Sequence, residues 1–96
     1  MKMFEYDFSD RLRHKFSKIA KKDKVLGLNL KKKIKEVISN DLVSIDRYKN
    51  LRSPLNEYKR IHLTGEFILL FIVDKENRHI TFMDVTHWDN AYKSRE

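Results

Sequence analysis

Two histidines in the second half of the chain close stretches that alternate apolar and polar residues. His62 ends "YKRIHL", and His87 follows "TFMDVT". An imidazole titrates near neutral pH and is the commonest proton-transfer group in enzymes. If "YKRIHL" is a strand, His62 shares one face with Tyr58 and Arg60. We expect the hairpins that follow to bring His87 near His62, with both side chains on one face of a sheet.

Two imidazoles beside a guanidinium suit a metal-free ribonuclease. Attack of a 2′-hydroxyl on its own phosphodiester needs a base, an acid for the leaving oxygen, and cations for the charge of the phosphorane. His62 and His87 would serve as acid and base, and Arg60 as the phosphate clamp. The alternative is that each histidine only hydrogen-bonds a neighbour. His14, among charged residues, and His79, beside a turn, are expected to be ordinary surface residues.

Other cations and aromatic residues near these histidines suit contacts with RNA. Arg47, Lys49 and Arg52 lie in one polar connection, where they would meet phosphates. Trp88 or Tyr92 would stack on an exposed base. A position for Trp88 at the edge of the core is an equal alternative.

A different chemical interpretation treats His62, Glu66, His87 and Asp89 as metal ligands. Their types suit zinc or manganese. Their spacing, however, contains no close helical ligand pair such as two histidines four residues apart. We therefore predict no metal site and no cofactor.

Charge is distributed unevenly along the 96 residues. Residues 1–52 carry 15 Lys and Arg against 7 Asp and Glu, a net +8, whereas residues 53–96 carry 6 against 7, a net −1. The basic half suits a polyanion or an acidic partner, or else reflects well-solvated helices. The chain has no cysteine, its longest apolar run (67–73) has the length of a strand, and its start lacks a signal peptide. We expect a soluble cytoplasmic protein that does not contact a membrane.

The periodicity of apolar residues predicts an α+β domain with the order β-α-α-β-β-β. A short strand in 2–8 precedes a helix over 8–22, and Asp23 caps a second helix whose apolar stripe runs from Leu26 to Ile38. A polar connection over 40–55 leads to strands in 58–64, 67–73 and 78–86. The two-helix hairpin should pack on one face of a small antiparallel sheet, with a short helical turn after Thr86. The histidines are expected on the other face.

Two segments resemble toxins of the RelE/ParE superfamily, closest to the RelE/YafQ-like mRNA interferases. In "YKRIHLTGEFILLFIVD", His62, the acidic Glu66 and the apolar run that follows match the family arrangement. In "FMDVTHWDNAYK", His87 and Tyr92 resemble the closing histidine and aromatic residue of the family. Trp88 stands where a second histidine is frequent. Lys49 stands where some relatives have another histidine.

The resemblance covers residues 1–96 as a single RelE-like domain. It implies a ribosome-dependent endoribonuclease that cuts mRNA in the ribosomal A site by metal-free 2′-hydroxyl attack, and an antitoxin protein that silences it. The implied catalytic residues are His62, His87, Glu66, Arg60, Lys49 and Tyr92. The implied RNA-binding residues, for mRNA and ribosomal RNA, are Arg47, Arg52, Trp88, Lys93, Lys31, Lys32 and Lys33. A ParE-like gyrase inhibitor, or a decayed toxin that only binds antitoxin, is the alternative on the same fold.

Overall fold

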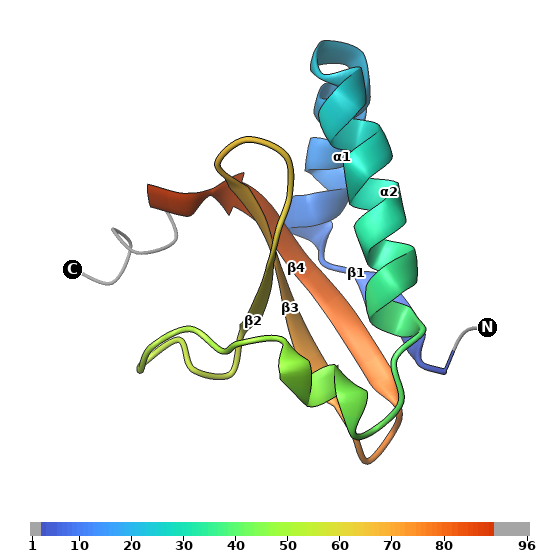
Figure 1. Ribbon diagram of the computed structural model, residues 1–96. Helices are drawn as coiled ribbons and strands as arrows, with labels where there is room; N and C mark the ends of the chain where they lie inside the picture. Colours follow the sequence, from blue (N-terminus) through green and yellow to red (C-terminus); the bar gives the residue numbers. More distant parts are fainter. Residues whose placement is uncertain (1–2, 90–96) are drawn as a thin grey trace.

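The computed structural model describes residues 3–89, and its elements follow the predicted order (Figure 1). They are β1 (Glu5–Phe8), α1 (Asp10–Lys22), α2 (Lys24–Ile38), a 3-10 turn η1 (Ser44–Arg47), β2 (Lys59–His62), β3 (Phe67–Asp74) and β4 (His79–His87). The turn η1 lies in the connection that was predicted to be irregular. Tyr92, Lys93 and the predicted turn of the tail beyond Asp89 lie outside the described residues. No helix within residues 3–89 is both long and apolar enough to cross a membrane.

Side-chain caps set the start of both helices. The Ser9 hydroxyl accepts a hydrogen bond from the Leu12 N–H at 3.1 Å at the start of α1. Asp23 ends α1 by donating its N–H to the Ile19 carbonyl, and its carboxylate caps α2 by accepting from the Leu26 N–H at 3.0 Å. With one residue between them, the helices form the predicted antiparallel hairpin (Figure 1).

The sheet has the strand order β1-β4-β3-β2 and is mixed rather than wholly antiparallel. Strands β2, β3 and β4 form the predicted antiparallel meander, but β1 pairs with β4 in parallel. The helix hairpin explains this direction, because it returns the chain to the end of the sheet where β1 begins. There the Met3 and Phe4 N–H groups donate to the Ile38 carbonyl at 2.8 and 3.1 Å. Strands β2 and β4 therefore run the same way as β1.

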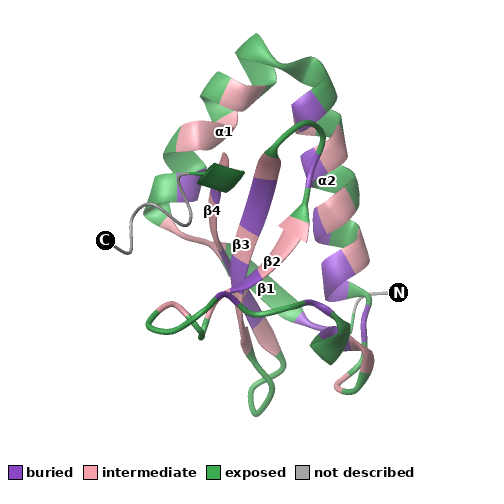
Figure 2. Ribbon diagram, turned by 60° about the vertical axis from the view of Figure 1, so that its left-hand side comes forward, coloured by how far each residue is buried: buried purple, intermediate pink, exposed green. Residues whose placement is uncertain are grey.

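The hydrophobic core lies between the helix hairpin and one face of the sheet, as predicted (Figure 2). The α2 stripe is buried, and with Leu12 of α1 it packs against β3 and β4. The sheet contributes Leu69, Phe71, Ile80, Phe82 and Val85 to this core. The opposite face of the sheet, called here the helix-free face, is the side from which alternate residues of β2 and β3 project.

Phe82 lies at the centre of an aromatic cluster, so its truncation tests the core. Its ring centroid lies 5.8 Å from that of Phe8 and 5.9 Å from that of Phe71, and the side chain is fully buried. We expect Phe82→Ala to lower the free energy of unfolding by about 3 to 5 kcal/mol, through lost burial and the remaining cavity. Urea denaturation measures this change. Val43→Ala, at a side chain 81% exposed, is the control and should change stability little. Equal losses in the two variants would contradict this core.

Candidate functional site

Lys49 and Arg60 lie side by side on the helix-free face. The segment before β2 runs antiparallel to that strand: the Arg60 N–H donates to the Lys49 carbonyl at 3.0 Å, and the Leu51 N–H donates to the Tyr58 carbonyl at 2.9 Å. Opposed residues of an antiparallel pair project from the same face. Arg60 is opposite Leu70 of β3, away from the core residues Leu69 and Phe71. Two cationic side chains therefore project from neighbouring positions on the face that the helices leave open.

His62 and Trp88 complete a cluster around Arg60. The His62 and Trp88 rings stack with centroids 6.1 Å apart and an interplanar angle of 29°. The Arg60 guanidinium carbon lies 6.0 Å from the Trp88 ring centroid, within reach of a cation–π attraction. Lys49, Arg60, His62 and Trp88 are called the basic cluster below. It contains the Arg60 guanidinium and the His62 imidazole that the sequence predicted on one face, where the predicted aromatic residue was Tyr58 rather than Trp88.

The Arg60 side chain has a buried donor that finds no partner in the described part of the chain. Its Nε is buried and finds no hydrogen-bond acceptor within residues 3–89. Buried polar groups are nearly always satisfied, so this donor is open to an acceptor from outside residues 3–89, such as a bound anion. Guanidinium groups bind phosphate oxygens through paired N–H donors. The basic cluster is therefore suited to a phosphate.

His87 lies on the other face of the sheet, so the expectation that it shares a face with His62 is wrong. His62 pairs with Ile68, which pairs with Thr86, whereas His87 pairs with Phe67. Because side chains alternate along a strand, Thr86 and not His87 shares the face of His62. The His87 and Phe67 rings meet edge to face at 5.8 Å.

The polar partners of His87 lie where β4 ends. Its Nε2 is 3.3 Å from a carboxylate oxygen of Glu66, and its Nδ1 accepts from the Asp89 N–H at 3.3 Å. These contacts bring together three of the four side chains considered as metal ligands, but the fourth, His62, stacks on Trp88. Within residues 3–89, no three His, Cys, Asp or Glu side chains form a group that could hold a metal ion.

The residues predicted to bind RNA divide between two surfaces. Arg52 is exposed in the loop before β2. Lys31 and Lys32 are exposed on α2 in the helix layer, and Lys33 lies 3.5 Å from Glu36. His14 is exposed, and His79 lies 3.5 Å from Asp7, so neither joins the basic cluster.

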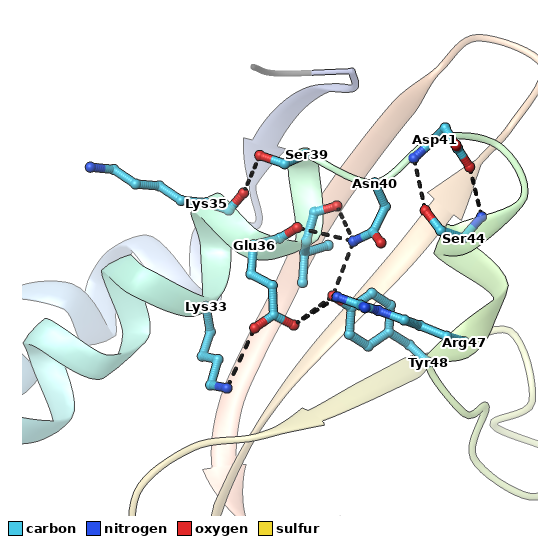
Figure 3. Close-up of polar contacts among 10 residues, drawn as sticks. Lys33, Lys35, Glu36, Ser39, Asn40, Asp41, Ser44, Arg47 and Tyr48 are labelled. Carbon is cyan, nitrogen blue, oxygen red and sulfur yellow. Dashed lines mark hydrogen bonds and ion pairs between the residues drawn. The ribbon is translucent and has the colours of Figure 1, made fainter.

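A polar network joins the end of α2 to the segment that carries Lys49 (Figure 3). The Tyr48 hydroxyl donates to Glu36 at 2.7 Å and accepts from Asn40 and from Arg47, each at 3.0 Å. The Arg47 guanidinium is also 3.3 Å from Glu36, so this arginine is engaged in the network rather than projecting into the basic cluster. Burial raises the pKa of Tyr48. The network fixes the residue directly before Lys49.

Sequence reasoning missed Lys59, which is buried on the core face of β2. Its ammonium donates to the Tyr48 carbonyl at 2.9 Å and to the Asn50 side-chain oxygen at 3.0 Å. The signal was present in the sequence, because Lys59 alternates with Ile61 and Leu63 and is therefore a charge within an apolar stripe. The Glu36–Tyr48 contact gave no such signal, because these two residues come together only when the connection between α2 and β2 has folded.

Comparison with known proteins finds similar chains. "Putative toxin RelE4" of Methanocaldococcus jannaschii is 37% identical over 94 residues, which cover 98% of this chain and 96% of that protein. A mutant of the E. coli toxin RelE in the free state aligns with a TM-score of 0.68 at 22% identity, covering 100% of this chain and 94% of the other. A chain of the YoeB-YefM complex from Staphylococcus aureus gives a TM-score of 0.70 at 20% identity, covering 88% and 95%. No protein-family model matches the sequence.

The network around Glu36 should make stability depend on pH. Burial raises the pKa of Glu36, but the Tyr48 hydrogen bond and the charges of Lys33 and Arg47 outweigh it and hold the pKa below its usual 4.5. The carboxylate therefore contributes stability that is fully present above pH 4.5 and is lost as the pH falls through the lower folded pKa. We expect Glu36→Gln to be less stable than the wild type at neutral pH, with the difference shrinking in acid.

Urea denaturation over a pH series measures this difference. Glu57→Gln, at an exposed carboxylate in the loop before β2, is the matched control. A stability loss in Glu36→Gln that is the same at every pH would show that the network does not depend on the ionised carboxylate.

Proposed function

The chain belongs to the RelE toxins of the RelE/ParE superfamily, and we propose that it is an endoribonuclease that cuts mRNA on the ribosome. Toxins of this RelE, YoeB and YafQ type act in toxin-antitoxin systems. The observation that carries the proposed activity is the buried Arg60 donor, unsatisfied within residues 3–89 and placed beside Lys49 and His62. A scissile phosphate would provide the acceptor that Arg60 lacks.

The basic cluster provides the groups that metal-free cleavage needs. The 2′-hydroxyl gives up its proton as its oxygen forms a bond to phosphorus, the bond to the 5′-oxygen breaks and that oxygen takes up a proton, and the products are a 2′,3′-cyclic phosphate and a 5′-hydroxyl. Arg60 and Lys49 stabilise the additional charge of the phosphorane. His62 transfers a proton on the same face, and Trp88 stacks on a base of the bound RNA.

His87 and Glu66 form the edge of this site. Because His87 projects from the other face of β4, we propose that it positions the end of the strand rather than exchanging a proton with RNA. The Glu66 carbonyl accepts from the Trp88 N–H at 2.7 Å, so the Glu66 loop also fixes the backbone that carries the stacking ring. Tyr92, in the tail that follows, is proposed as a further catalytic group.

The other basic residues are proposed to contact RNA away from the scissile phosphate. Arg52 and Lys93 would bind the mRNA backbone, and Lys31, Lys32 and Lys33 ribosomal RNA. An antitoxin is the proposed protein partner, by analogy with the solved YoeB-YefM complex of the same fold. Action in the cytoplasm follows from the need for ribosomes.

Expression of the chain without an antitoxin tests the activity. We expect growth to arrest and transcripts to be cut within codons, leaving 2′,3′-cyclic phosphates on the upstream fragments. End mapping of cellular mRNA with a ligase specific for cyclic phosphates makes this measurement. Growth arrest with intact transcripts and gyrase trapped on DNA would instead establish the gyrase-inhibitor alternative.

Histidine variants test the division of roles between the two faces. We expect His62→Ala to slow cleavage on purified ribosomes by about 100-fold or more, the usual contribution of a general acid or base. His87→Ala should have a smaller effect on the rate. His14→Ala, at an exposed histidine of α1, is the matched control and should cleave like the wild type. Equal large losses for His62→Ala and His87→Ala would contradict the proposed roles.

A further inference from the structure

Lys59 carries a positive charge into the core face of the sheet. The residue is 9% exposed, and its nearest carboxylate oxygen, on Asp46, is 4.0 Å from the ammonium. Its two closest partners are neutral oxygens, the Tyr48 carbonyl and the Asn50 side chain. Removing an ammonium group from water is costly, and apolar replacements of buried charges are often neutral or stabilising. Stability alone therefore does not explain a lysine at this position.

The two oxygens that Lys59 binds belong to the residues on either side of Lys49. Asn50 is bridged to Lys59 across the antiparallel pair, and the Lys49 carbonyl accepts from the Arg60 N–H. Residues alternate along this segment, so Asn50 projects to the core face and Lys49 to the helix-free face. Lys59 and Lys49 are thus on opposite faces of the same short pair of strands.

We propose that Lys59 is a positioning residue that holds the segment 48–50 in register against β2, so that the Lys49 ammonium lies beside Arg60 at the phosphate. This inference rests on the proposed function, which gives Lys49 and Arg60 a common phosphate. A shift of one residue would turn Lys49 to the core face, because the side-chain period of a strand is two. The Tyr48 network fixes the hydroxyl end of that residue, whereas Lys59 fixes its carbonyl, next to Lys49.

The position of the Lys49 side chain depends on the backbone around it. Its side chain is exposed, and its backbone carbonyl bonds to Arg60 at the edge of the sheet. A displacement of about 1 Å of a catalytic group can cost about 100-fold in rate. Loss of the two Lys59 hydrogen bonds would release the segment on both sides of Lys49.

Amide hydrogen exchange tests the positioning without reference to activity. In Lys59→Met, which keeps the side-chain length and removes the charge, we expect faster exchange at the Arg60 and Leu51 N–H groups, by about 10-fold. The Leu63 N–H, bonded to the Phe67 carbonyl in the same sheet, is the internal control and should not change. Unchanged exchange at Arg60 and Leu51 in the folded variant would overturn the proposal. This readout remains valid if the wild-type chain cleaves no RNA, an outcome that would refute the proposed function alone.

A double-mutant cycle on ribosome-dependent cleavage tests the link to Lys49. If Lys59 acts through Lys49, Lys59→Met and Lys49→Ala should each slow cleavage, and the double variant should be no slower than the slower single variant. Multiplied losses in the double variant would overturn the proposal. If Lys59 had only a general structural role, Lys59→Met would slow cleavage by the same factor with or without Lys49→Ala.

Asn50→Ala keeps the test decisive if Lys59→Met fails to fold. Asn50 is exposed, so its truncation removes one acceptor of Lys59, together with its own hydrogen bond to the Asn56 carbonyl at 2.8 Å, without opening the core. We expect faster exchange at the Arg60 N–H and a smaller loss of rate, again not multiplied by Lys49→Ala. Wild-type exchange and cleavage in Asn50→Ala, or a loss that multiplies with Lys49→Ala, would overturn the proposal.

Discussion

The alternation of side chains along a strand decides what this sheet can do. Along β2, Lys59 and Ile61 turn toward the helices while Arg60 and His62 turn away. The same four-residue strand therefore supplies core packing and the centre of the basic cluster. Strand β3 is buried on both sides near its start, where Ile68 and Leu69 are each 0% exposed. A strand that is covered on both faces lies beside β2 and holds the backbone that carries Arg60 in place.

The same alternation explains why one part of the site could be predicted from the sequence and another could not. The face shared by Arg60 and His62 follows from local spacing, and it was predicted correctly. The face of His87 depends on how β4 pairs with β3, including the register shift between Leu70 and Phe71. The shift changes the spacing of the core residues of β4 from two, between Ile80 and Phe82, to three, between Phe82 and Val85, and our prediction for His87 did not take this break into account. The prediction for His87 failed at that point.

The fold itself was largely accessible from the sequence because its elements carry strong local signals. Ser9 and Asp23 cap helices whose apolar stripes recur every three or four residues, and the three closing strands are separated by short turns. The parallel direction of β1 was missed because it depends on where the helix hairpin returns the chain. The pairing of Lys49 with Arg60 was missed for a similar reason, since the connection carries no strand-like pattern and gains its order from contacts with β2 and α2.

Charge is arranged in two layers that act over different distances. The lysines exposed on α2 contribute to a net charge of +7, which attracts a polyanion before contact and weakens with added salt. In the proposed function, the basic cluster acts at contact, where a guanidinium and an ammonium would face one phosphate. Hydrogen bonds connect the two layers. The Tyr48 hydroxyl donates to Glu36, near the end of α2, and the Tyr48 carbonyl accepts from Lys59. A displacement of that end of α2 would therefore reach Lys49 through Tyr48, so the exposed lysines of α2 and the basic cluster are not independent.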